Sequence, residues 1–342
     1  MRFLVFGTGA IGVYIGGSLA LSGHPVVFLD RPEPAVQLNQ TGLWLTRDGQ
    51  RQRIPNAQVM SSIEDALELE PFDAILFAIK SYDTAGAIQM LSPWAERLPP
   101  LLCLQNGVDN EPALVTALGP ERVIAGTVTT AIARPGPGEV VEERRRGVGI
   151  AAGHPLSARL VEAFDETGLN ARLFPIAADM KWSKLLTNLL GNATAAILDM
   201  TPAEVFAHPG LFRLEVAQLR EALAVMRALD TRVVDLPGTP VRALAFAVQY
   251  LPLSLSRPFL GRAVGGGRGG KMPSLHIDLY GGRGLSEVDY LNGAVVRHGE
   301  RKGVPTPANR LLNDTLLALA SAALPRAAFS HKPEKFLQGI AR

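Results

Sequence analysis

The chain has 342 residues, a length that suits two domains better than one. Its 34 Lys and Arg nearly balance its 32 Asp and Glu, so the concentrated positive field of a nucleic-acid-binding protein is not expected. The single cysteine, Cys103, excludes an internal disulfide framework and a zinc site built from several cysteines. No run of about 20 apolar residues indicates a membrane span, and we expect a cytoplasmic protein with no membrane partner.

Strand-like and helix-like segments alternate along the first part of the chain. Short apolar runs predict strands at residues 2–6, 25–29, 74–79 and 101–104, and helical spacing predicts helices at residues 11–22 and 62–68. Such alternation is typical of an α/β fold with a parallel sheet and right-handed crossovers.

The pattern changes after residue 123. The β-branched stretches at 123–133, 140–141 and 148–152 predict further strands that extend the same sheet, with a turn at 135–138. The charge run at 142–146 is interpreted as a solvated edge, and residues 154–167 as a helix.

Helical patterns dominate the rest of the chain, at residues 177–198, 212–229, 287–303 and 309–323. We therefore predict a parallel-sheet domain over residues 1–175, an all-helical domain over 176–330 and a tail over 331–342. The residues from Pro325 onward carry little apolar pattern, so we expect them to be loosely held.

A glycine-rich sequence follows the first predicted strand, where Gly7-Thr8-Gly9-Ala10-Ile11-Gly12 fits G-x-G-x-x-G. In this pattern Gly7 permits a tight turn, Gly9 lets the backbone approach a pyrophosphate, and Gly12 lets the helix pack closely on the strand. The anion then binds to N–H groups at the helix N-terminus. The motif stands between a strand and a helix, as it must, and predicts a Rossmann-type dinucleotide-binding domain.

The second predicted strand ends in Asp30 and Arg31, 18 residues after Gly12. An acidic residue at this place binds a ribose hydroxyl of NAD, whereas an arginine accommodates the 2′-phosphate of NADP. Because both residues are present, the spacing leaves NAD(H) and NADP(H) open.

Lys184, Asn188 and Asn192 recur every four residues in the predicted helix at 177–198, which would align them on one face. Asparagine has poor helix propensity, so two on one stripe indicate a polar task. A lysine with two amides can bind a carbonyl and a hydroxyl group; the alternative is a solvent-exposed polar stripe.

With these features the chain resembles the ketopantoate reductase (2-dehydropantoate 2-reductase) family over nearly its whole length. The motifs that carry the resemblance are the N-terminal glycine motif, Lys80, Gln105-Asn106-Gly107, Lys184-Leu185-Leu186-Thr187-Asn188 with Asn192, Pro273-Ser274-Leu275 with Asp278, Glu287-Val288-Asp289-Tyr290-Leu291-Asn292-Gly293 and Gly303-Val304-Pro305-Thr306-Pro307.

The resemblance implies a Rossmann-type domain and a helical substrate and dimerisation domain, with NADPH reducing the C2 ketone of 2-dehydropantoate to give pantoate, in pantothenate biosynthesis. It makes Lys184 the general acid at the ketone oxygen, a role that suits an ammonium beside developing negative charge. Glu287 would contact the substrate hydroxyl or orient the lysine. Asn188 and Asn192 would bind the hydroxyl, and Ser274 the carboxylate.

The resemblance also implies that Asn106 lies near the nicotinamide and the substrate, with Lys80 and Arg31 along the cofactor. No metal is implied. The residues expected to bind the cofactor are therefore Gly7, Thr8, Gly9, Ala10, Ile11, Gly12, Asp30, Arg31, Lys80, Asn106 and Glu287; those expected to bind substrate are Asn188, Asn192, Ser274 and Asn106.

Two features depart from the family pattern. Asp30 stands where NADPH-dependent members commonly have an uncharged residue, so NADP(H) is favoured by resemblance and NAD(H) stays open. Residues 231–271 match no family motif and could reshape the substrate pocket. An NAD(P)-dependent dehydrogenase of another small 2-hydroxy or 2-oxo acid is therefore the main alternative, followed by a non-catalytic dinucleotide-sensing protein.

The remaining candidate residues are Cys103, which is expected in the core, and His276, which could touch substrate. The sequence leaves a homodimer open.

Overall fold

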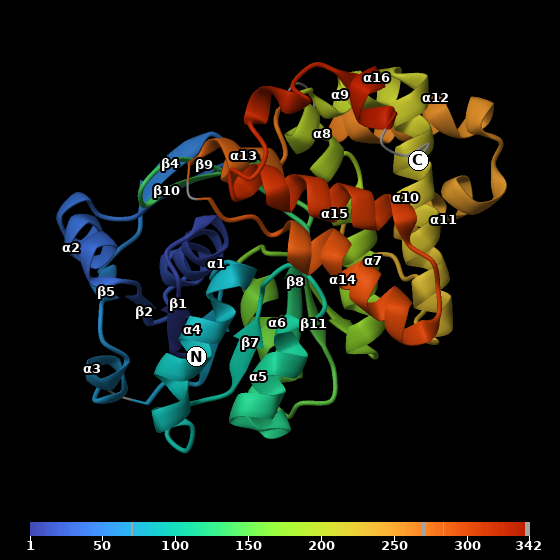
Figure 1. Cartoon of the computed structure of the whole chain (residues 1–342). Helices are drawn as coiled ribbons and strands as arrows, with labels where there is room; N and C mark the ends of the chain where they lie inside the picture. The colour runs from blue at the N-terminus through green and yellow to red at the C-terminus, as the bar shows by residue number, and fades with distance from the viewer. Residues whose placement is uncertain (70, 269–270, 283, 339–342) are drawn as a thin grey trace. The chain divides into compact units, whose positions relative to one another are not determined.

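The computed structural model describes residues 1–69, 71–268, 271–282 and 284–338 (Figure 1). The chain divides into two compact units: Met1–Lys181 with Leu236–Thr239, and Trp182–Asp235 with Pro240–Arg342. Among the described residues, no helix is long and apolar enough to cross a membrane. Residues 265–271 fit the G-x-x-x-x-G-K pattern of a phosphate-binding loop, but Met272 follows where such a loop has Ser or Thr. This stretch includes residues 269 and 270, which lie outside the described residues.

The first unit is built on a parallel sheet, as the strand–helix alternation predicts. Within the described residues it has eight strands in the order β12-β11-β8-β7-β6-β1-β2-β5, all neighbours being parallel except β8 and β11. Their bounds are β1 (Phe3–Phe6), β2 (Val26–Leu29), β5 (Gln58–Met60), β6 (Ala74–Phe77), β7 (Leu101–Cys103), β8 (Val123–Val128), β11 (Val148–Ala151) and β12 (Ala171–Phe174).

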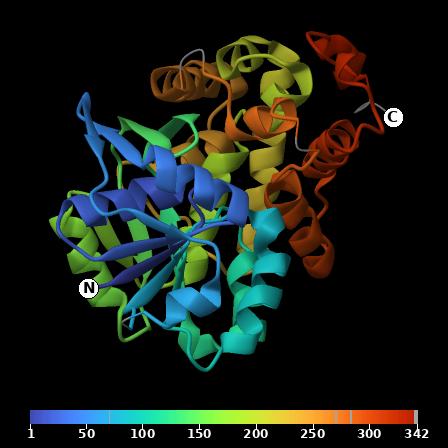
Figure 2. The same cartoon turned by 90° about the vertical axis from the view of Figure 1, so that its left-hand side faces the viewer.

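Helices cover both faces of this sheet (Figures 1 and 2). Alternate strand residues enter two separate cores: Phe3 and Val5 pack with α1, α2 and α6, whereas Leu4 and Phe6 pack with α3, α4 and α5. Burial on both faces explains why the strands read as continuous apolar runs. The helices are α1 (Ala10–Leu21), α2 (Pro32–Thr41), α3 (Ile63–Leu67), α4 (Thr84–Leu91), α5 (Asn110–Leu118) and α6 (Ser157–Glu166), with short 3₁₀ turns at Ser81–Asp83, Ser92–Trp94 and Pro120–Arg122.

A second, smaller sheet corrects two expectations from the sequence. β9 (Ala131–Gly136) and β10 (Glu139–Arg144) do not extend the main sheet but pair with β3 (Trp44–Arg47) and β4 (Gln50–Arg53) in the order β4-β3-β10-β9. The solvated-edge interpretation is wrong at Glu142, whose side chain is only 4% exposed. Its carboxylate accepts hydrogen bonds from the Tyr14 hydroxyl at 2.6 Å and Arg145 Nε at 2.8 Å, and thereby ties this sheet to α1.

The second unit is helical throughout its described residues, as predicted. Helix α7 begins in the first unit and continues into the second, because the boundary between the units falls after Lys181. The helices are α7 (Ala177–Leu189), α8 (Ala193–Leu198), α9 (Pro202–Ala207), α10 (Pro209–Ala228), α11 (Val241–Tyr250), α12 (Leu253–Arg268), α13 (Ser274–Tyr280), α14 (Val288–Lys302), α15 (Pro307–Ala320) and α16 (Pro333–Leu337), with a 3₁₀ turn at Arg326–Ala328.

The described residues after Pro325 are anchored by a buried aromatic side chain. Phe336 in α16 is only 2% exposed, and its ring makes an edge contact with Phe329 at a centroid distance of 5.4 Å. The expectation of a loosely held segment from Pro325 onward is therefore wrong at Phe336, because a single buried aromatic side chain anchors the segment without any apolar periodicity.

Candidate active site

The glycine loop between β1 and α1 forms a narrow turn with one open side. Gly7 has a φ of +104°, which favours glycine, and a Cβ at position 12 would lie 1.9 Å from the Gly7 carbonyl oxygen. A Cβ at position 9 would instead meet no described atom nearer than the Ala78 carbonyl oxygen at 3.9 Å. The N-cap of α1 is Gly9, which has no side chain to cap the helix, and the first turn of α1 has no acidic residue. The loop thus has the room and the polarity for a phosphate group.

Asp30 is bonded to this loop. Its Oδ2 atom accepts hydrogen bonds from the Thr8 backbone N–H at 2.8 Å and from the Thr8 hydroxyl, while Oδ1 accepts from the Arg31 backbone N–H at 2.8 Å. Thr8 is 2% exposed, whereas Arg31 is exposed at the N-terminus of α2. The carboxylate therefore fastens the glycine loop to the end of β2, and a guanidinium stands beside it facing solvent.

The other residues predicted to bind the cofactor follow neighbouring strands. Lys80 follows β6 and Asn106 follows β7, and β1, β6 and β7 are adjacent and parallel. The carboxyl ends of these strands therefore share one edge of the sheet, where ligands of such folds bind. The Asn106 carbonyl oxygen accepts hydrogen bonds from Ser81 Oγ at 3.1 Å and Asn110 Nδ2 at 2.7 Å, which fixes the loop after β7.

A buried ion pair, which the sequence patterns do not predict, lies next to the loop after β7. Lys181 Nζ lies 2.6 Å from Glu111 Oε1 and also donates to the carbonyl oxygens of Gln105 at 2.6 Å and Gly126 at 3.2 Å. Lys181 is 5% exposed. Its position gives a signal: Lys181 shares the four-residue spacing of Leu185 and Leu189, which are buried, and this spacing places it on the buried face of α7.

Cys103 lies in the core next to this pair, as expected. Its side chain is fully buried, and burial raises the pKa of the thiol well above its ordinary value, with the Glu111 carboxylate adding to the effect. The thiol therefore stays protonated and contributes packing rather than nucleophilic chemistry.

In the second unit, Lys184 and Asn188 lie one helical turn apart on α7, but Asn192 does not continue their stripe. The helix ends at Leu189, Gly191 adopts a φ of +62°, and Asn192 becomes the N-cap of α8. The prediction of a single helical face through Asn192 is therefore wrong, because one glycine in the left-handed region ends the helix. The two asparagines still meet, since Asn192 Nδ2 donates to the Asn188 carbonyl oxygen at 2.9 Å.

The side chain of Asn192 also reaches the helix that carries Ser274. Asn192 Oδ1 accepts a hydrogen bond from the Leu275 backbone N–H at 3.2 Å. Ser274 is the first residue of α13 and is exposed, whereas Asn192 is 3% exposed. The second unit thus brings Asn188, Asn192 and Ser274 together, which are three of the four residues expected to bind substrate.

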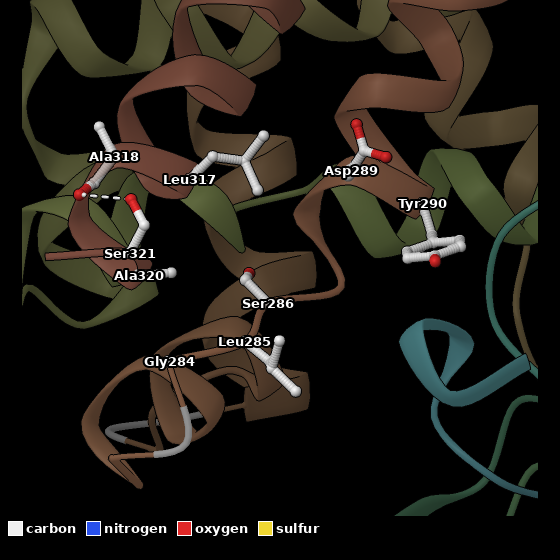
Figure 3. Close-up of a pocket in the computed structure, with 9 residues that line it drawn as sticks. All are labelled: Gly284, Leu285, Ser286, Asp289, Tyr290, Leu317, Ala318, Ala320 and Ser321. Atoms are coloured by element: carbon white, nitrogen blue, oxygen red, sulfur yellow. Dashed lines mark hydrogen bonds between the residues drawn. The ribbon is translucent and has the colours of Figure 1, made fainter. Parts of the chain in front are cut away.

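Glu287 is the N-cap of α14 and is 3% exposed. The residues around it line an open cavity of about 570 Å³, and Figure 3 shows Asp289 and Tyr290 projecting from α14 and Ser286 preceding it. The full lining is Gly284, Leu285, Ser286, Asp289, Tyr290, Leu317, Ala318, Ala320 and Ser321. Glu287 itself is not part of this lining, so its predicted role does not rest on the cavity.

The His276 side chain contacts two other residues of the second unit. Its Nε2 atom lies 2.7 Å from Asp199 Oδ1, and its ring stacks on Tyr280 at a centroid distance of 4.1 Å. These contacts fix the orientation of the imidazole ring within the second unit, and a contact of His276 with substrate stays a prediction. The described residues contain no group of three or more His, Cys, Asp or Glu side chains arranged to hold a metal ion.

Comparisons with known proteins match both units. The family model "Ketopantoate reductase PanE/ApbA" matches residues 3–153, and its C-terminal counterpart matches residues 177–320. A 2-dehydropantoate 2-reductase of Mesorhizobium japonicum is 28% identical over 349 residues, covering 93% of this chain and 96% of the relative.

Solved structures give the same picture. A PanE/ApbA family ketopantoate reductase from Ralstonia eutropha has a TM-score of 0.78 at 28% identity, covering 94% of this chain and 99% of that chain. A D-mandelate dehydrogenase in complex with NADH and anilino(oxo)acetate has a TM-score of 0.76 at 22% identity with the same coverage. The second likeness, at this identity, concerns the fold alone.

Proposed function

The chain belongs to the ketopantoate reductase family of NAD(P)H-dependent oxidoreductases, and we propose that it reduces 2-dehydropantoate to pantoate with NADPH. The observation that carries the proposal is the arrangement around Asn192. Its amide contacts the Asn188 carbonyl oxygen and the Leu275 N–H. It thereby holds the backbone that carries the Asn188 amide on α7 next to the backbone that carries the Ser274 hydroxyl on α13, and these two groups suit a hydroxyl and a carboxylate. A small acid with a hydroxyl at its far end presents these two groups.

The cofactor assignment is supported by the glycine loop and by Asp30. The turn at Gly7 and Gly12 and the open side at Gly9 fit a dinucleotide pyrophosphate. Asp30 already accepts three hydrogen bonds from Thr8 and Arg31, which leaves its carboxylate little capacity for a ribose diol. The exposed Arg31 guanidinium would pair with a 2′-phosphate, and this favours NADPH over NADH.

The chemistry expected of this chain is a proton transfer coupled to reduction. When bound, the reduced nicotinamide supplies a hydride to C2 of the substrate. We assign Lys184 as the group that hydrogen-bonds the ketone oxygen and donates the proton as negative charge develops there. Asn188 and Asn192 would bind the substrate hydroxyl, Ser274 the carboxylate, and Glu287 would orient Lys184 or contact the hydroxyl. Their part is to hold C2 in a reactive position.

The test compares ketopantoate with 3,3-dimethyl-2-oxobutanoate, which has the same skeleton without the hydroxyl group. Initial rates of NADPH oxidation with the two acids, beside pyruvate and 2-oxoisovalerate, measure what the hydroxyl contributes. A site built to hydrogen-bond that hydroxyl should prefer ketopantoate in kcat/KM by a factor of about 100 or more. A preference below about tenfold would contradict the assigned role of the two asparagines.

The same experiment separates the alternatives. Faster oxidation of NADH than of NADPH would contradict the assignment of Arg31 to the cofactor phosphate. Turnover of another 2-hydroxy acid with the oxidised cofactor, and none of ketopantoate, would replace the proposal by a dehydrogenase on the same fold. Tight cofactor binding without turnover of any acid would favour a dinucleotide sensor.

A further inference from the structure

The turn that carries Asn192 is held from behind by a buried carboxylate. Glu215, on α10, is 1% exposed. Its Oε2 atom accepts a hydrogen bond from the Gly191 backbone N–H at 2.7 Å, and its Oε1 atom accepts one from Thr194 Oγ1 at 2.5 Å. These two donors stand on either side of Asn192 in the sequence. One carboxylate therefore fixes the chain both before and after Asn192, the residue that contacts Asn188 and α13.

The carboxylate is in turn anchored to its own helix and beyond. Gln218 Nε2 donates to Glu215 Oε2 at 2.8 Å and to the Leu189 carbonyl oxygen at 3.3 Å. The second bond gives a donor to a carbonyl oxygen at the C-terminus of α7. Gln218 Oε1 accepts from Asn292 Nδ2 of α14 at 2.9 Å. Gln218 and Asn292 are fully buried. The contacts therefore link α7, α8, α10 and α14 through polar groups shielded from water, where hydrogen bonds are strongest.

The geometry explains why a carboxylate stands here. Gly191 adopts a left-handed conformation in the short turn between α7 and α8, so its N–H lies outside both helices and needs another acceptor. Glu215 presents two acceptor oxygens to three donors, a set that a neutral amide cannot reproduce because one of its two arms is a donor. A Gln at this position would place an NH₂ group against either the Gly191 N–H or the Thr194 hydroxyl.

We propose that Glu215 is a positioning residue of the substrate site: its carboxylate fixes the turn at residues 190–192 so that the Asn192 amide faces the substrate hydroxyl and holds α13 with Ser274. The inference rests on the proposed function, because it assumes that Asn192 binds substrate. As a positioning residue, Glu215 touches neither substrate nor cofactor and acts only through Asn192.

The central test is Glu215→Gln, compared with wild type on ketopantoate and on 3,3-dimethyl-2-oxobutanoate. Loss of a hydrogen bond to a charged group predicts a rise in the KM for ketopantoate of about tenfold to hundredfold. The preference for ketopantoate over the analogue should shrink by a similar factor, while the KM for NADPH changes less than about twofold. A purely structural role would lower the melting temperature and leave the preference between the two acids unchanged, and that result would overturn the proposal.

Thr194 provides a milder pair of variants in case Glu215→Gln does not fold. Thr194→Ser keeps the hydroxyl donor and should retain the preference, whereas Thr194→Val removes it and should reduce the preference in the same direction. Met226→Ala serves as the matched control: Met226 is buried in α10, 11 residues and roughly 16 Å along the axis from Glu215. It should destabilise the protein without changing the ratio of the two substrates.

Amide hydrogen exchange keeps this inference separate from the proposed function, since it needs no substrate. Exchange at residues 190–194 should speed up in Glu215→Gln and Thr194→Val, and stay at the wild-type rate in Thr194→Ser and Met226→Ala. Unchanged exchange in Glu215→Gln would overturn the positioning role whatever acid the enzyme reduces. Faster exchange in an enzyme that does not reduce ketopantoate would refute the substrate assignment and leave the hold on the turn in place.

Discussion

Replacing Lys181 by methionine should destabilise the first unit more than any surface substitution. Lys181 Nζ lies 2.6 Å from Glu111 Oε1 and donates to the carbonyl oxygens of Gln105 and Gly126. Methionine fills the same volume but leaves the Glu111 carboxylate, whose side chain is 11% exposed, without its cation. Two backbone carbonyl oxygens, one in the loop after β7 and one within β8, lose a donor at the same time.

The magnitude follows from the burial of the pair. At 2.6 Å and an effective dielectric constant of about 20, the attraction between the two charges is about 6 kcal/mol, much of it offset by desolvation. Removing one partner of a buried pair costs about 3–5 kcal/mol, because the remaining charge is uncompensated. We expect Lys181→Met to lower the free energy of unfolding by an amount in this range.

Urea unfolding, followed by circular dichroism and tryptophan fluorescence, measures the change. The double variant Lys181→Met with Glu111→Gln is the informative control, since it removes both charges and should lose less stability than Lys181→Met alone. A loss below about 1 kcal/mol in the single variant, or a larger loss in the double variant, would refute the reasoning.

Two further predictions concern the first unit. Asp30→Asn should weaken the binding of NADPH and of NADH by similar factors, about tenfold, because it loosens the Thr8 loop that both cofactors use. Arg31→Ala should weaken the binding of NADPH alone. A ratio of the Kd for NADPH to the Kd for NADH that changes in Asp30→Asn and not in Arg31→Ala would contradict this division. Burial and the Glu142 hydrogen bond raise the pKa of Tyr14 above its ordinary value, so its contribution to stability is complete below pH of about 10 and is lost as the pH rises further through the folded-state pKa. Thermal unfolding between neutral pH and pH of about 11 should show this loss of stability in wild type and a weaker loss in Tyr14→Phe. The Tyr14→Phe substitution should itself lower the free energy of unfolding by about 1–3 kcal/mol at neutral pH. Parallel curves of stability against pH for the two proteins would contradict the prediction.

Local patterns predicted the parts of the fold that local chemistry determines. The apolar runs of β1, β6 and β7 mark strands buried on both faces, and Gly7 and Gly12 are required by a turn and a close contact that other residues cannot make. Partner choice between strands is a different matter. Residues 131–144 have the composition of strands, but nothing in that composition tells whether they join the main sheet or pair with β3.

The candidate site shows the same limit. The spacing of Lys184, Asn188 and Asn192 identified polar residues that lie close together, yet it could not show that Gly191 ends the helix before the third of them. Glu142 and Glu215 look like ordinary charged residues in the sequence, since their burial depends on tertiary neighbours: the Tyr14 hydroxyl for the first, and the Gly191 N–H and Thr194 hydroxyl for the second.

The most direct test of the account is the turnover of Lys184→Ala with ketopantoate at saturating NADPH, measured together with its Kd for NADPH. Loss of the proton donor predicts that kcat falls by a factor of about 100 to 10,000 while the Kd stays within about threefold of wild type. A kcat near the wild-type value would contradict the assignment of Lys184 as the acid. An equal loss of cofactor affinity would show that the lysine serves the dinucleotide and not the ketone.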